Sequence, residues 1–87
     1  MEMLVETVKV PDEGFKALMG QRITLFCMNY IYTGKLIGVN TTCVKLTDAS
    51  IVYETGSFQD KSWKDAQKLP YDLYVQNNSI ESFCVLK

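Results

Sequence analysis

Short runs in which apolar and polar residues alternate, separated by turn-forming residues, fill the chain from residue 22 onward. A period of two is typical of strands that bury one face. Gly34 and Gly38 lie in the second run, where glycine marks a bend or a close backbone approach. Bent strands in a short chain favour a small all-β barrel. The pattern predicts five strands, at residues 22–27, 30–39, 42–55, 73–76 and 80–86.

Two further elements are expected before the first strand. Residues 1–10 are rich in β-branched side chains and predict an accessory strand or a frayed N-terminal arm. Residues 11–19 begin with proline, continue with two acidic residues and are followed by glycine, which predicts a short α-helix. Phe15, Leu18 and Met19 fall on one face of this helix, so it should cap the core.

The domain organisation is simple. Residues 56–70 show no clear periodicity and predict a variable loop or an extended hairpin tip. The chain of 87 residues contains no internal repeat, low-complexity tract or linker, and it fits one domain. We therefore predict a single domain over residues 1–87, with its barrel at residues 21–86.

Composition and charge narrow the class of protein. With 47% hydrophobic and 22% charged residues, a packed core is expected. No apolar run approaches the roughly 18–20 residues that cross a bilayer, and the start is acidic, so we expect no membrane partner and a cytoplasmic location. The net charge of −1 provides no overall positive field, and any contact with nucleic acid must be local.

The sequence contains few residues that suggest a catalytic site. The three cysteines, Cys27, Cys43 and Cys84, are odd in number and widely spaced, which argues against a disulfide framework and a zinc site. There is no histidine and no glycine-rich phosphate loop. We expect no metal, no cofactor and no small-molecule substrate, and we predict that the protein is not an enzyme.

Two segments resemble the motifs of a known family. Tyr32, Gly34 and Leu36, followed by an apolar strand that ends at Asp48-Ala49, resemble the first Sm motif, aromatic-x-Gly-x-Leu. Residues 73–80 resemble the second motif. On these residues the chain is similar to the Sm-like family of LSm and Hfq-type ring proteins. The resemblance implies a five-stranded SH3-type barrel with a short N-terminal α-helix.

The resemblance also implies how copies assemble. In the family, the last two strands of neighbouring copies pair, which here makes a homo-oligomeric ring of about five to seven subunits. Unpaired edges of residues 73–76 and 80–86 agree with this expectation. An unrelated SH3-like monomeric interaction module is the alternative. The implied interface residues are Leu73, Tyr74, Val75, Ile80, Phe83 and Val85.

Single-stranded RNA is the ligand that the resemblance implies, at two turns facing the pore. Thr42 stands where the family has a stacking aromatic or histidine, and Gln76-Asn77 replace a basic pair. The remaining amides can hydrogen-bond base edges, or they simply support the turns. The RNA-binding candidates are Asn40, Thr42, Gln76, Asn77 and Asn78.

A second candidate for nucleic-acid contact lies in the 56–70 segment, where Trp63 stands between Lys61 and Lys64. Neighbouring acidic residues nearly cancel this charge, so Trp63 packed on its own barrel or on a neighbour is the competing interpretation. The resemblance implies a ring-forming protein that binds single-stranded RNA in RNA metabolism or chaperoning. The alternative is an oligomeric scaffold, or protein-interaction ring, that has lost RNA binding.

Overall fold

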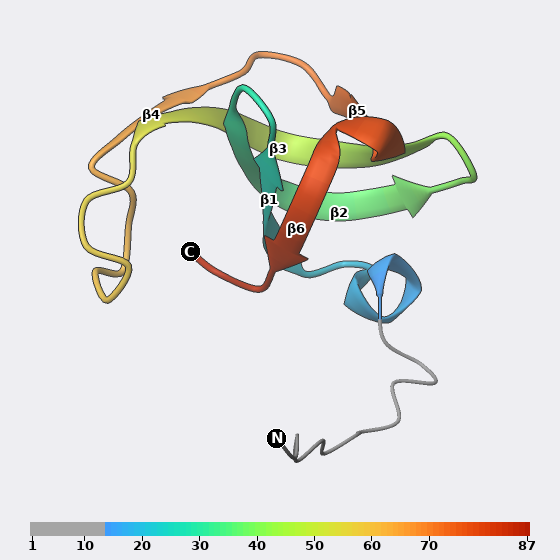
Figure 1. The fold of residues 1–87 in the computed structure, drawn as a ribbon, viewed down its shortest axis with the longest axis horizontal. Helices are drawn as coiled ribbons and strands as arrows, with labels where there is room; N and C mark the ends of the chain where they lie inside the picture. Colours follow the sequence, from blue (N-terminus) through green and yellow to red (C-terminus); the bar gives the residue numbers. More distant parts are fainter. Residues whose placement is uncertain (1–13) are drawn as a thin grey trace, which may run out of the picture.

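The chain forms one antiparallel sheet of six strands, seen in a computed structural model that describes residues 14–87 (Figure 1). The predicted all-β class is confirmed. The predicted strand or arm at residues 1–10 lies outside the described residues. The strands are β1 (Arg22–Cys27), β2 (Ile31–Val39), β3 (Cys43–Glu54), β4 (Asp65–Lys68), β5 (Leu73–Gln76) and β6 (Ile80–Cys84).

The long strand β3 organises the sheet, whose order is β4-β3-β2-β1-β6. One edge of β3 pairs with β2, while the other edge pairs with β5 and β4 at different positions. Residues 43–46 of β3 pair with β5, and residues 50–54 pair with β4. The two short strands therefore follow one another along the same edge of β3.

A bend at Asp48 separates these two halves of β3. Its backbone has φ 50°, a left-handed conformation that aspartate tolerates better than most residues. The carboxylate pairs with Lys68 on β4 (2.7 Å) and with Arg22 on β1 (3.1 Å). Lys68 first, and then Arg22, hold the pKa of Asp48 below its usual value. Ion pairs thus connect Asp48 to the neighbouring strand β4 and to the more distant strand β1.

The core follows the alternation that the sequence predicts. Ile23 and Leu25 of β1 and Val44 and Leu46 of β3 alternate along their strands and are fully buried. Thr24 of β1, on the opposite face, is also fully buried. Apolar residues of β2 and β5 close the same cluster. Its buried members are Ile23, Leu25, Leu36, Val44, Leu46, Ala49 and Val75.

The predicted α-helix at residues 11–19 is wrong in type and extent. The described part is a short 3-10 helix, η1 (Phe15–Leu18). Gly14 before it has φ 101°, and Met19 after it is extended, so the backbone cannot continue an α-helix in either direction. Phe15 and Leu18 nevertheless pack against the core, and the Phe15 ring stacks on Phe83 with centroids 4.1 Å apart.

The number of strands and the closure of the sheet also differ from the prediction. The five predicted strands are present, and β4 adds a sixth inside residues 56–70, the segment predicted to be a variable loop or an extended hairpin tip. All four residues of β4 are exposed, so it has no apolar alternation to detect. Within residues 14–87, β5 pairs with β3 alone and β6 pairs with β1 alone. The sheet is therefore not closed into a five-stranded barrel.

Substitution of Gly34 tests how closely β2 and β3 approach each other. A Cβ at this position would lie 3.1 Å from three atoms of β3, including backbone atoms of Thr47 and Ala49. We expect Gly34→Ala to lower the free energy of unfolding by about 1–3 kcal/mol. Gly38→Ala is the matched control, because its Cβ would meet only the Lys45 Cβ at 3.4 Å. Urea denaturation at one protein concentration measures both; equal losses would contradict the close approach.

Candidate functional site

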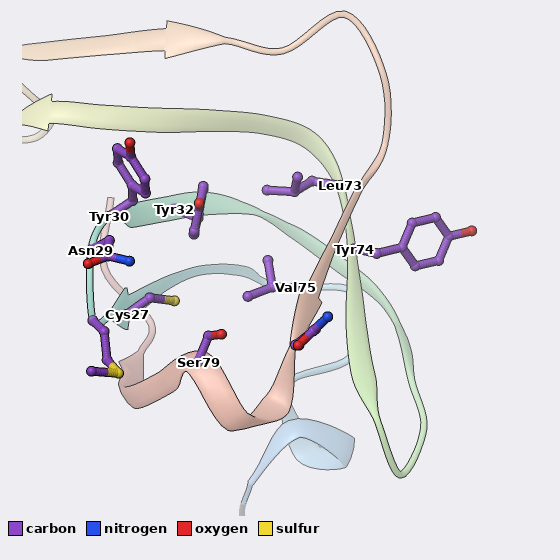
Figure 2. A pocket seen from close by; sticks show the side chains of 10 residues that line it. Cys27, Asn29, Tyr30, Tyr32, Leu73, Tyr74, Val75 and Ser79 are labelled. Atoms are coloured by element: carbon purple, nitrogen blue, oxygen red, sulfur yellow. The ribbon is translucent and has the colours of Figure 1, made fainter.

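A pocket of about 270 Å³ lies beside β5, between this strand and the end of β1 (Figure 2). Leu73 and Val75 of β5 point into it, together with Cys27 of β1 and Tyr32 of β2 (Figure 2). Tyr74 points the opposite way, as the alternation of a strand requires (Figure 2). The inner face of β5 thus lines a hollow that has both apolar and polar side chains in its wall.

Two groups that line this pocket, Cys27 and Tyr32, have raised pKa values, which favours their neutral forms. Burial raises the pKa of the Cys27 thiol, and the carboxylate of Glu81 raises it further. Burial is also the main cause that raises the pKa of the Tyr32 hydroxyl. A reactive cysteine requires the opposite shift, toward the thiolate. The raised pKa therefore argues against Cys27 as an activated nucleophile.

The outer edge of β5 presents backbone groups to solvent. The Asn77 N–H donates to Thr42 O (2.9 Å), which marks these two residues as a hydrogen-bonded pair. Such pairs alternate along antiparallel strands, so Val75 also bonds toward β3, opposite Val44. The N–H of Gln76 consequently faces the other edge, where β5 has no partner strand within residues 14–87.

The structure brings the five RNA-binding candidates together, where the β2–β3 turn meets η2 (Asn77–Ser79). Two of them support the turns. Asn40 Oδ1 accepts hydrogen bonds from Thr42 N (2.7 Å), Thr42 Oγ1 (3.0 Å) and Cys43 N (2.8 Å). Asn77 Nδ2 donates to Asn40 O (3.2 Å). These asparagines hold the turns in the manner of Asx turns.

The other three candidates line a pocket of about 460 Å³ on the outer face. Tyr74 joins them, with 62% of its surface exposed. The Lys45 ammonium lies 5.1 Å from the centroid of the Tyr74 ring. Hydrogen bonding with the Tyr74 side chain is the main cause that raises the pKa of Lys45, and the nearby Asp72 carboxylate (3.8 Å) raises it further. An exposed aromatic ring can stack a nucleic-acid base, and a cation beside it can contact the phosphate backbone. Tyr74 was predicted only as an interface residue, although strand alternation places its side chain outward.

The six predicted interface residues divide by burial. Val75 is only 5% exposed and belongs to the core of its own chain. Leu73 and Ile80 are half-buried against that core. Tyr74, Phe83 and Val85 have exposed surface. The latter three are the apolar side chains that this region of the molecule offers to a partner.

The loop candidates lie far from these turns, at the opposite end of the longest axis (Figure 1). Trp63 meets Phe58 edge to face, with centroids 6.2 Å apart. The Lys64 ammonium pairs with Glu54 (3.0 Å), and Lys61 is exposed. The structure thus does not combine Lys61, Trp63 and Lys64 with the turn residues into one site.

No protein-family model matches the chain, and no curated protein matches it. Among residues 14–87, no group of three or more acidic, cysteine or histidine side chains is placed to hold a metal ion. The helices in this part of the chain are too short to cross a membrane. The functional interpretation therefore depends on the edges of β5 and β6 and on the neighbouring pockets.

Substitutions of Asn40 test whether its side-chain amide stabilises the turn. Asn40→Ala removes three hydrogen bonds of the turn, and we expect it to lower the free energy of unfolding by about 1–2 kcal/mol. Asn40→Asp keeps the acceptor oxygen and should lose less. Asn78→Ala is the control, with no expected loss. Urea denaturation followed by circular dichroism provides the comparison; an Asn40→Ala protein as stable as the original would contradict the assignment.

Proposed function

We propose that the chain is an Sm-like subunit that assembles with its own copies into a ring. In this assembly β5 of one copy pairs with β6 of the next. The observation that carries the proposal is that both strands pair on one side only within residues 14–87. The Sm-like motifs at residues 32–49 and 73–80 support the same arrangement. Head-to-tail contacts of this kind close into a ring when the rotation between copies allows it. The family resemblance implies about five to seven copies.

The composition of the edges favours β5 over β4 as the pairing strand. β4 carries Asp65 and Lys68, and charged side chains on an edge discourage pairing with another chain. β5 reads Leu-Tyr-Val-Gln and has no charge. Both strands extend along the same edge of β3, but only β5 leaves an edge without charged side chains.

Exposed apolar surface supports the same pairing. Phe83 on β6 and Val85 just after it are exposed, and Leu73 on β5 is half-buried beside the pocket. Pairing of β5 with β6 would bring these side chains together and remove them from water. Burial of apolar surface stabilises association by about 25 cal/mol per Å². Hydrogen bonds between the strands then fix the register.

We further propose that the assembled ring binds single-stranded RNA on the outer face of β5. The exposed Tyr74 ring, the Lys45 ammonium and the adjoining pocket with Thr42, Gln76 and Asn78 support this second step. The Tyr74 side chain stands out of the sheet, so pairing along the strand edge leaves it accessible. A ring that carries no RNA and acts as a scaffold is the alternative.

Gln76→Pro tests the pairing without disturbing the subunit. Gln76 has φ −68°, which a proline ring adopts without strain, and its N–H faces away from β3. Proline at this position therefore removes an edge donor while the bonds to β3 remain. We expect the variant to fold and to lose the oligomer, giving a species of 9.9 kDa in light scattering.

Gln76→Ala is the matched control for this experiment, because it removes the side chain and keeps the N–H. It should retain the mass of the original oligomer. Circular dichroism shows whether both variants are folded. A Gln76→Pro protein that keeps the original oligomer mass would defeat the proposed pairing, as would an original protein that is monomeric at high concentration.

Tyr74→Ala tests the RNA-binding step. Loss of a stacking platform weakens binding of single strands by about 1–3 kcal/mol per base, or about 5- to 150-fold. We expect this loss in titrations with labelled oligo-U and oligo-A, with affinity that falls as salt rises. Tyr71→Ala is the control, because Tyr71 has the same 62% exposure but lies outside the pocket. Absence of binding by the folded oligomer would favour the scaffold.

A further inference from the structure

The ammonium group of Lys87 is surrounded by backbone carbonyls of the β3–β4 loop. Its Nζ donates hydrogen bonds to Ser57 O (2.8 Å), Thr55 O (3.1 Å) and Ser62 O (3.2 Å). A primary ammonium has three N–H groups and no acceptor. The three carbonyls therefore match the full donor set of one primary ammonium.

Two aromatic rings complete this environment. Nζ of Lys87 lies 4.3 Å from the centroid of the Trp63 ring and 5.8 Å from that of Phe58. The faces of aromatic rings attract cations at such distances. We call the three carbonyls of Thr55, Ser57 and Ser62, with these two rings, the ammonium cage.

The loop that carries the cage has hydrogen bonds of its own. Lys64 N donates to Thr55 O (3.4 Å), and Asp60 N donates to Ser57 O (3.1 Å). Gly56 adopts φ 65° at the turn, where a Cβ would also lie 3.1 Å from the Lys64 Cβ. Contacts within the loop therefore position two of the three carbonyls without help from Lys87. This is the property expected of a preformed binding site.

Hydrogen bonds to the backbone of residues 86 and 87 hold Lys87 beside the ammonium cage. Thr24 Oγ1 is buried in the sheet and donates to Leu86 O (2.6 Å), and Arg22 Nε donates to Lys87 O (3.4 Å). These bonds place the Lys87 side chain over a loop that lies 25 to 32 positions earlier in the sequence.

We propose that the ammonium cage is a binding site for a primary alkylammonium group, such as the lysine side chain of a partner peptide. Lys87 fills the site in cis and competes with that partner. A cavity of about 420 Å³, lined by Trp63, Lys64 and Lys87 among others, leaves room for the partner to approach. The proposal does not depend on ring assembly or on RNA.

The chemistry of the cage predicts selectivity among ammonium groups. Aromatic rings alone attract any cation, including quaternary ammonium groups. Three inward carbonyls also require hydrogen-bond donors, which a trimethylated ammonium lacks. The cage should therefore prefer an unmethylated lysine side chain.

A local anion site is the competing use of this surface. Arg22, Lys61 and Lys64 also line the cavity. However, Arg22 pairs with Asp48 (3.1 Å) and Lys64 with Glu54 (3.0 Å), so two of these cations already have carboxylate partners. The groups on this surface therefore fit a site for an ammonium group better than a site for an anion.

Lys87→Ala should open the cage, and Trp63, the only tryptophan in the chain, reports on it by fluorescence. We expect n-butylammonium to give a saturable fluorescence change in Lys87→Ala. The apparent affinity should be about tenfold weaker in the original protein, because a tethered competitor acts at millimolar effective concentration. Butyltrimethylammonium should bind Lys87→Ala at least about fivefold more weakly than n-butylammonium, since it has no N–H donors.

Three controls accompany this titration at constant ionic strength. Lys61→Ala removes a lysine of the same loop that takes no part in the cage contacts, and it should behave as the original protein. Phe58→Leu in the Lys87→Ala background should weaken n-butylammonium binding. Inorganic phosphate should leave the fluorescence of Lys87→Ala unchanged.

Several results would overturn the proposal. One is that n-butylammonium binds Lys87→Ala and the original protein equally, or gives no saturable response in folded Lys87→Ala. Another is that butyltrimethylammonium binds Lys87→Ala as tightly as n-butylammonium does. A saturable fluorescence response to phosphate would also overturn it. If Lys87→Ala does not fold, NMR of the original protein decides. The ε-methylene protons of Lys87 should then be shifted upfield of those of the other lysines by the Trp63 ring, and an unshifted resonance would refute the cage.

Discussion

The bend of β3 at Asp48 is the constraint on which the rest of the fold depends. It lets one strand pair with β5 along its first half and with β4 along its second half. The ion pairs from Asp48 to Arg22 and Lys68 connect the bend to β1 and β4. With β5 held at one end of β3 and β6 held on β1, neither strand completes the sheet with the other. The open edges result directly from this arrangement.

Open edges do not by themselves drive association, because water satisfies their amides and carbonyls in the free subunit. The favourable free energy must come mainly from apolar surface. Phe83 and Val85 are exposed on one side of the proposed joint, and the pocket beside Leu73 and Val75 lies on the other. The backbone hydrogen bonds contribute register and direction, which decide whether copies form a closed ring or an open filament.

The sequence predicted the strands well where a buried face imposes alternation, and all five predicted strands are present within two residues of their expected bounds. It missed β4, which forms through backbone pairing while its side chains remain exposed. The α-helix prediction failed because the positive φ of Gly14 stops the helix one residue before Phe15. The turn candidates lie close together in the structure, while the contacts of Lys87 with a loop 25 to 32 positions away have no local signal in the sequence.

The outward position of Tyr74 has a consequence for any flexible polymer that meets the proposed assembly. Each copy would repeat the same aromatic platform at a fixed spacing set by the rotation between subunits. A strand held on one platform would experience the next at high local concentration, so contacts that are weak singly would add to a long residence time. Such avidity would depend more on the length of the strand than on its base sequence, because stacking on tyrosine discriminates little between bases.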